Sequence, residues 1–138
     1  MQNSAASASA QNGQLPLPQQ TISVGTTTIL AEIADTPPQL QAGLSGRKAL
    51  PEGRGMLFVF SQDGNWGFWM PDMHFSIDIL WMDASDKILT IAPEVSPKTY
   101  PKIFYPSAPA RYVLELPAGF ASAHGIRVGD TISLPTSG

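Results

Sequence analysis

Residues 76–91 have the sequence SIDILWMDASDKILTI, in which two apolar segments enclose a polar turn. In residues 76–83 both faces of an extended chain would be apolar, which is typical of a strand covered on both sides. Residues 83–86 (DASD) favour a turn, and residues 87–94 (KILTIAPE) alternate as a partner strand would. The stretch therefore predicts a β-hairpin that contains one deeply buried strand.

Short β-branched and apolar segments elsewhere in the chain predict further strands. These segments are residues 21–34, which give two strands around Gly25, and residues 55–60, 67–70, 110–116 and 126–134. An Asp-Gly turn is expected within residues 61–65, between two of these strands.

Two short helices are also expected. The first covers residues 39–44, after a proline pair that Asp35 or Thr36 can cap. The second covers residues 117–125, where Pro117 opens the helix and Gly125 closes it. About eight short strands with two helices predict a β-rich α+β fold, built on a small antiparallel or mixed barrel-like sheet rather than on βαβ units.

Composition excludes several classes of function. The chain has 138 residues, a net charge of -3 and no cysteine. Its eight basic residues form no run, so we expect no nucleic-acid binding. No apolar run approaches the roughly 20 residues of a membrane span. The absence of cysteine excludes disulfides and thiolate metal sites.

The first 20 residues differ from the rest, because they are rich in Ser, Ala, Gln and Pro and have no charged side chain. We expect them to form a disordered tail before a single domain at residues 21–135. Ala8-Ser9-Ala10 has the small-x-small form of a signal-peptidase site, although no basic or apolar region precedes it. The segment is either the remnant of an export signal or a linker. We favour the first, which predicts a periplasmic or otherwise extracytoplasmic protein.

Residues 92–109 contain five prolines together with Tyr100, Phe104 and Tyr105. Proline at this density prevents both helix and central strand. A long loop of this kind in a compact domain is typical of a lid or binding loop, or of a packed Ω-loop.

Asp78 raises the main functional question, because it lies between Ile77 and Ile79 in the buried strand. A carboxylate in such a place must be hydrogen-bonded or paired. Glu32 and Glu115 occupy similar apolar strands, and the candidate partners of the three acids are Arg47, Arg54 and Arg111.

Two interpretations of these acids stay open. In the structural one, Asp78 accepts backbone N–H bonds and holds a loop, while Glu32 and Glu115 face solvent. In the functional one, Asp78, Arg47 and Glu115 line a cleft, where a carboxylate serves as a general acid or base or contacts a ligand.

Aromatic and sulfur-containing side chains give weaker signals. Five aromatic residues crowd into positions 66–81, a density more typical of a core than of a site, although exposed Trp and Tyr side chains bind sugars or extended peptides. Met70, Met73, His74 and Met82 match no metal motif, so we expect neither a metal nor a cofactor. His124 fits a helix end without a catalytic role.

Several segments together resemble one known family. They are AEIADTPPQLQAGLSGR (31–47), GMLFVF (55–60), FWM followed by IDILWMD (68–70 and 77–83), and ARYVLELPAGFASAHGIRVGD (110–130). In this order they resemble the domain-of-unknown-function-192 family, also called uncharacterised protein family 0127. The resemblance implies a small β-rich α+β barrel-like fold and an exported bacterial protein, and it implies no reaction. The family commonly has a Lys-Asn-Thr-like stretch after FWM, where this chain has residues 71–76 instead.

Three hypotheses about function follow. The leading one is an exported, monomeric binding or accessory module for a small ligand or an envelope component. Its ligand contacts would be Arg47, Trp69, Asp78, Tyr105 and Arg111. The alternatives are a hydrolase or lyase acting on an envelope glycan or peptide, with Asp78 or Glu115 as acid or base, and a structural interaction module.

Overall fold

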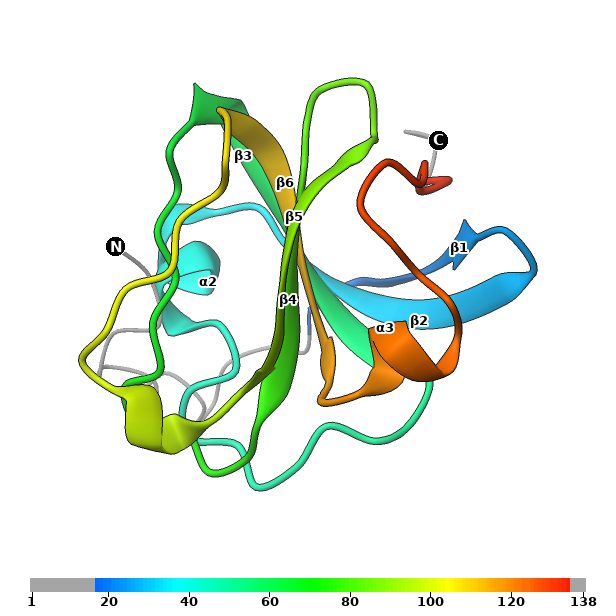
Figure 1. Cartoon of the computed structure of the whole chain (residues 1–138). Coiled ribbons are helices and arrows are strands. Elements are labelled where there is room, and N and C mark those ends of the chain that lie inside the picture. The colour runs from blue at the N-terminus through cyan, green and yellow to red at the C-terminus, as the bar shows by residue number, and fades with distance from the viewer. Residues whose placement is uncertain (1–16, 135–138) are drawn as a thin grey trace.

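The computed structural model describes residues 17–134, and a single mixed sheet dominates it (Figure 1). The strands follow the spatial order β1-β2-β3-β6-β4-β5. Their bounds are β1 Gln19–Val24, β2 Thr27–Ala34, β3 Arg54–Gly64, β4 Ile77–Met82, β5 Ile88–Val95 and β6 Ala110–Pro117. The helical segments are α2 Pro37–Ala42, the 3-10 turn η1 Pro97–Thr99 and α3 Phe120–Ala123.

The pairing of the strands is mixed. β2 and β3 run parallel and are connected through α2, whereas the other neighbours in the sheet pair antiparallel. β6 lies between β3 and β4, which are consecutive in the chain. The predicted β-rich α+β class and mixed sheet are confirmed. The six strands of the described residues do not close into a barrel, so the predicted barrel-like sheet and the predicted count of eight strands are not confirmed.

Three segments differ from the strand prediction. Residues 67–70 form one isolated bridge, between Phe68 and Phe104, because their partner is not a strand. The partner is the segment between β5 and β6, residues 96–109, which we call the proline-rich loop. The last predicted strand, at residues 126–134, forms two isolated bridges to different partners: Thr131 pairs with Lys87, and Ser133 pairs with Ser23. Neither bridge continues into a ladder of paired residues, so no strand forms. The expected turn at residues 61–65 lies largely inside β3, which continues to Gly64 through an irregular register.

The start of the domain also differs from the prediction. β1 begins at Gln19, two residues before the expected boundary at residue 21, because Gln19 and Gln20 pair with Glu32 and Ala31 of β2. Residues 1–16 of the predicted tail, including Ala8-Ser9-Ala10, lie outside the described residues.

The two faces of the sheet bury two separate cores. The α3-side core joins Leu80 and Leu114 of the sheet to Phe120 of α3 and to Ile126 and Ile132 after it. The loop-side core lies on the opposite face, where the segments that follow α2 and β3 and the proline-rich loop cover the sheet. Its members include Leu44, Phe58, Phe68, Met70, Met73, Ile79, Trp81 and, at its margin, Phe104.

β4 is fully buried, as its continuous apolar sequence predicts. β5 and β6 flank it, and the two cores cover its faces. Leu80 and Met82 face α3, whereas Ile77, Ile79 and Trp81 face the loop side. By this alternation Asp78 points to the α3 side.

The two α-helices begin differently. α2 begins at Pro37 after Thr36, and Gln39 Oε1 accepts hydrogen bonds from the backbone N–H groups of Asp35 and Thr36 at 3.1 and 3.2 Å. The N-cap at Thr36 agrees with the prediction, but the helix begins and ends two residues earlier than the predicted 39–44. α3 begins at Phe120 rather than at Pro117, which is the last residue of β6.

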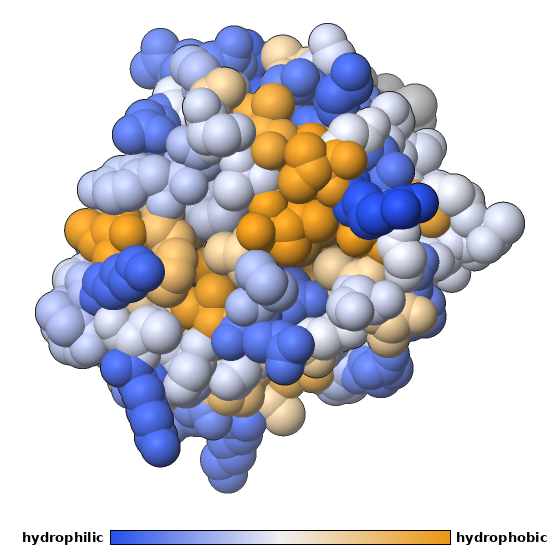
Figure 2. Space-filling model, in the orientation of Figure 1, coloured by the Kyte–Doolittle hydropathy of each residue, from blue (hydrophilic) through white to orange (hydrophobic). Residues whose placement is uncertain are grey.

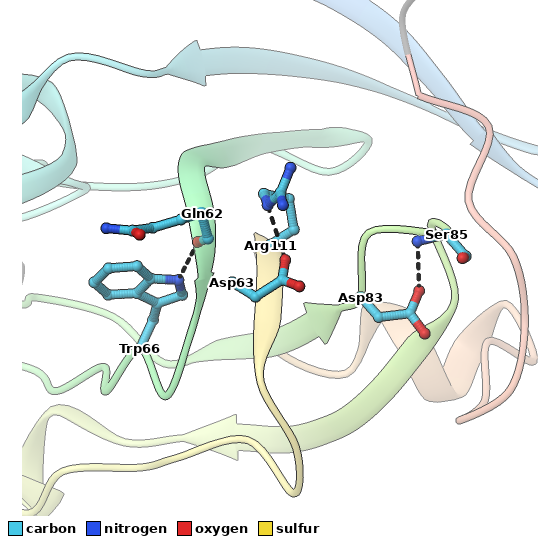
Figure 3. Close-up of polar contacts among 6 residues, drawn as sticks. All are labelled: Gln62, Asp63, Trp66, Asp83, Ser85 and Arg111. Atoms are coloured by element: carbon cyan, nitrogen blue, oxygen red, sulfur yellow. Dashed lines mark hydrogen bonds and ion pairs between the residues drawn. The ribbon is translucent and has the colours of Figure 1, made fainter.

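The turn between β4 and β5 leads to a prediction about pH. Asp83 Oδ1 accepts a hydrogen bond from the backbone N–H of Ser85 at 2.8 Å (Figure 3). It accepts a second from the backbone N–H of Lys87 at 3.1 Å. Partial burial, and secondarily the charge of Asp83, raise the pKa of Asp86 above its ordinary value. The carboxyl group of Asp86 therefore ionises at a lower pH in the unfolded chain than in the folded one. The contribution of Asp86 to stability is greatest in acid and is lost as the pH rises through the ordinary value to the raised one.

Asp86→Asn should therefore raise the free energy of unfolding by a few tenths of a kcal/mol at pH about 7 and change it little below pH about 3. Asn also tolerates the positive φ of 68° at this position. Urea unfolding at the two pH values measures the difference. A gain of equal size at both values would show that the charge of Asp86 is not its cause.

Candidate functional site

Asp78 is fully buried, and its carboxylate is surrounded by backbone donors. Oδ1 accepts hydrogen bonds from the N–H groups of Glu94 at 2.8 Å and Gly119 at 3.0 Å, and Oδ2 accepts one from Ala121 at 2.9 Å. One side chain of β4 thus connects the edge strand β5 to the first turn of α3. This geometry favours the structural interpretation of Asp78.

The local backbone explains why an acid occupies this position. Two residues of β5, Pro93 and Glu94, lie opposite the single residue Asp78, since Ile77 pairs with Val95 and Ile79 with Ala92. β5 thus has one extra residue here, which forms a β-bulge. Glu94 adopts a positive φ of 49°, which is uncommon for a residue with a side chain. The carboxylate supplies the hydrogen bond that the bulged N–H of Glu94 would otherwise lack.

Glu115 lies on the opposite face of the sheet from Asp78. It pairs with Met56 of β3 and Ile79 of β4, both in the loop-side core, and its side chain is fully buried. Because the sheet separates them, the carboxylates of Asp78 and Glu115 cannot act on one substrate as an acid–base pair. Each is 0% exposed, so a general acid or base at either position would require an opening of the structure.

Arg47 pairs with Glu32 and not with Asp78. The guanidinium Nη1 and Nη2 lie 2.5 and 2.8 Å from the two carboxylate oxygens of Glu32, which is the bidentate geometry that arginine favours. Glu32 aligns with Met56, and Met56 with Glu115, so that the ion pair and Glu115 lie in one row across the loop side of the sheet.

Arg111 also has an acidic partner, at the far end of β6. Its Nε lies 2.9 Å from Oδ1 of Asp63, and both side chains are partly exposed (Figure 3). This contact joins β6 to the irregular end of β3. Arg111 is therefore placed away from Asp78 in the sheet, and the two do not converge.

Trp69 and Tyr105, by contrast, come together on one surface. Phe68 and Phe104 exchange two backbone hydrogen bonds, at 2.9 and 2.8 Å, and both contribute to the loop-side core. Because side chains alternate across such a bridge, their neighbours point outward. The outward neighbours are Gly67 and Trp69 on one segment and Ile103 and Tyr105 on the other.

Four side chains make up this surface, which we call the aromatic ridge: Trp69, Tyr100, Ile103 and Tyr105. The rings of Trp69 and Tyr100 lie 5.2 Å apart between centroids. Tyr100 is 50% exposed and Tyr105 52% exposed. A Cβ at position 67 would lie 2.6 Å from Cγ2 of Ile103 and 2.7 Å from Cε1 of Tyr105, so glycine allows the loop to pack closely there.

The other aromatic residues of the 66–81 cluster belong to the core, as their density indicates. Trp81 is fully buried, its ring lies edge-on to Phe68, and its Nε1–H donates to the carbonyl of Trp66 at 2.8 Å. Trp66 stacks on Phe60, and its own Nε1–H donates to the carbonyl of Gln62 at 3.3 Å (Figure 3). These contacts support the segment from which the ridge projects.

The methionines and histidines do not converge on a metal site. Met70 and Met73 lie in the loop-side core, Met82 lies in the α3-side core, and His74 is exposed beside Asp72. Within residues 17–134, no group of three His, Cys, Asp or Glu side chains is arranged to hold a metal ion. His124 is the C-cap of α3, and the centroid of its ring lies 4.1 Å from that of Phe120.

Two concave regions adjoin the segment after α3. A polar pocket of about 320 Å³ lies between the β1–β2 turn and this segment, and Thr26, His124, Asp130 and Thr131 contribute to its lining. A more apolar groove of about 410 Å³ lies between β5 and α3. Neither region was predicted, because each forms between segments distant in the sequence.

Comparison with known families agrees with this fold. The model of the DUF192 family, described as "Uncharacterized ACR", matches residues 20–134. The chain belongs to the DUF192 family. The match confirms the resemblance noted in the sequence, and the family's description assigns no reaction to this DUF192 domain. No curated protein matches the chain.

Two solved structures are similar to this DUF192 protein. One, from Sinorhizobium meliloti 1021, is provisionally described as a transcription regulator. It is 27% identical, with a TM-score of 0.82, and the match covers 88% of this chain and 97% of that one. The other, of unknown function, comes from Novosphingobium aromaticivorans DSM 12444. It is 25% identical, with a TM-score of 0.81, and the match covers 91% and 96%.

The ridge of this DUF192 protein shows what sequence reasoning found and missed. Trp69 and Tyr105 were predicted as ligand contacts, and the structure places both on one surface. Tyr100, Ile103 and the close approach at Gly67 were not predicted. Alternation around the buried Phe68 signals that Gly67 and Trp69 point outward, but no sequence pattern shows that Phe104 is the partner of Phe68.

Proposed function

We propose that this DUF192 protein is a binding module that recognises a carbohydrate component of the cell envelope through the aromatic ridge. The supporting observation is the concentration of exposed apolar side chains on the proline-rich loop. Of the four large hydrophobic residues exposed within residues 17–134, Tyr100, Ile103 and Tyr105 lie on this loop, and Val128 does not. A folded domain does not normally expose several such side chains together unless they contact something.

The chemistry of the ridge suits a sugar. The flat face of a Trp or Tyr ring provides apolar contact area for the C–H face of a pyranose, while the Tyr hydroxyl can hydrogen-bond at the edge of the ring. The ridge is also preorganised, since the Phe68–Phe104 bridge and the Trp69–Tyr100 contact fix its parts before a ligand arrives. Preorganisation reduces the entropy cost of binding.

The geometry supports binding better than catalysis. The two acids proposed for a hydrolase or lyase, Asp78 and Glu115, are fully buried on opposite faces of the sheet. Arg47 and Arg111 are already paired with Glu32 and Asp63. A role on nucleic acid, suggested only by the description of one structural relative, has little support in a chain of net charge -3 without a basic run.

We also propose that the protein works outside the cytoplasm, as an envelope ligand requires. The support is the small-x-small sequence Ala8-Ser9-Ala10 before Gln11. Within residues 17–134, no helix has both the length and the apolar character needed to cross a bilayer. Fractionation of cells that express the native gene tests the proposal, and recovery of the protein only with the cytoplasm would contradict it.

Removing a ridge ring should weaken sugar binding. We expect Tyr105→Ala and Trp69→Ala each to reduce the affinity for a soluble envelope-type oligosaccharide, such as an N-acetylglucosamine tetramer, by about tenfold. Tyr105→Phe should retain most of the affinity, because stacking depends on the ring. Tryptophan fluorescence titration and isothermal calorimetry measure the change.

Val128→Ala is the matched control, since Val128 is 60% exposed and lies outside the ridge. It should bind the sugar as the native chain does. The proposal is wrong if the native chain binds no oligosaccharide of an envelope panel, or if the control loses as much affinity as the ridge variants. Binding of an extended peptide at the ridge, with no sugar binding, would instead identify an interaction module.

A further inference from the structure

The groove between β5 and α3 is a second candidate site, separate from the ridge. It has a volume of about 410 Å³, within the range of small-ligand pockets. Ile91 and Pro93 line one wall, and Ala121 and Ile126 line the other, with Arg127 at the same end as Ile126. β5 is the last strand of the sheet, so within residues 17–134 no further strand flanks the groove on that side.

The walls of the groove are held at a fixed separation by Asp78. Its Oδ1 accepts a hydrogen bond from Glu94, next to Pro93 on the β5 wall, and its Oδ2 accepts one from Ala121 on the α3 wall. Ile126 is buried in the α3-side core, and its N–H donates to the carbonyl of Ala121 at 2.9 Å. The groove is therefore a preformed feature rather than a gap between mobile segments.

Arg127 gives the groove a charge. Arg47 and Arg111 both pair with acids, whereas within residues 17–134 the guanidinium of Arg127 has no ion pair or side-chain hydrogen bond. The nearby carboxylate of Asp130 is engaged by the backbone N–H of Arg127 at 2.8 Å. Arg127 is thus an exposed cation beside an apolar surface.

We propose that this groove binds an amphipathic carboxylate of the fatty-acid class, with the alkyl chain along Ile91, Pro93 and Ile126 and the carboxylate on Arg127. Burial of the chain supplies the affinity, and a charge-assisted hydrogen bond selects the acid over a neutral or cationic relative. Figure 2 looks onto the side of the molecule that shows β5, where apolar surface gathers near the centre of the view with strongly hydrophilic surface beside it.

Titration of the full chain with octanoate, followed by amide NMR spectra, tests the proposal. We expect the largest shifts at Ile91, Gly125 and Ile126. Octanol, which has the same chain without the charge, should bind about tenfold more weakly, and octylammonium should bind more weakly still. Arg127→Gln should reduce octanoate affinity about tenfold and leave that for octanol unchanged.

Arg54→Gln is the matched control, because Arg54 is an exposed arginine at the start of β3, outside the groove. It should leave octanoate binding unchanged. Equal binding of octanoate and octanol, shifts centred elsewhere, or an equal loss in both arginine variants would overturn the proposal, as would binding of a peptide carboxylate with no response to octanoate. Arg127→Gln should also leave oligosaccharide binding at the ridge intact, so failure at one site does not imply failure at the other.

Discussion

Replacing Asp78 with alanine should lower the free energy of unfolding by about 4 kcal/mol. The change removes the acceptor of three backbone N–H groups, those of Glu94, Gly119 and Ala121, in a site with no exposed surface. Each donor left without a partner costs about 1–3 kcal/mol, and water that enters the space offsets part of the sum. The loss is a large share of the roughly 5–15 kcal/mol that stabilise a domain.

Urea unfolding followed by tryptophan fluorescence measures this loss. Hydrogen exchange should also accelerate at the three amides before it does in the centre of the sheet, because the carboxylate joins β5 to α3. Asp78→Asn should cost about half as much, since one oxygen still accepts and the amide nitrogen cannot. Asp63→Ala, which removes a half-exposed acid paired with Arg111, should cost less than about 1 kcal/mol. Similar losses for Asp78→Ala and Asp63→Ala would contradict the role given to Asp78.

Replacing Trp81 with alanine should have an effect of similar size, about 4 kcal/mol. The side chain is fully buried in the loop-side core, and the centroid of its ring lies 6.1 Å from that of Phe68. Its Nε1–H also donates to the carbonyl of Trp66 at 2.8 Å. The substitution therefore leaves a cavity and a carbonyl without its donor, below the segment that bears the ridge.

Two further variants separate these contributions, again by urea unfolding. Trp81→Phe retains most of the apolar volume and loses the indole donor, so we expect a cost of about 2 kcal/mol. Trp66→Ala should also cost less than Trp81→Ala, because Trp66 is only partly buried and lies at the margin of the core, stacked on Phe60. A cost for Trp81→Ala no larger than that for Trp66→Ala would show that the buried indole does not organise this face.

The strands were predictable where their signal is local. β4, β5 and β6 lie within a residue or so of their expected bounds, because the alternation of apolar and polar side chains and the turn residues are visible within each segment. The segments at 67–70 and 126–134 have the same local character without forming strands. Whether a segment of this kind becomes a strand depends on a partner with free N–H and C=O groups, which local sequence does not reveal.

The candidate site was predicted only in part. Trp69 and Tyr105 were identified from residue type and from the proline-rich loop, and the structure brings them to one surface. Arg47 was expected to reach an acid, and it does reach one, but Glu32 rather than Asp78. Arg47 can pair only with an acid on its own face of the sheet. Which acids share that face depends on the register and order of the strands, which local sequence does not show.

The sequence by itself determined the β-rich class, the family, the buried character of β4 and the presence of an acid within it. Each of these depends on neighbouring residues or on short motifs. Only the tertiary structure decided what Asp78 does, because its backbone partners Glu94, Gly119 and Ala121 lie 16, 41 and 43 residues away. A buried carboxylate must find hydrogen-bond donors, but the packing of β5 and α3 around β4 determines which donors those are.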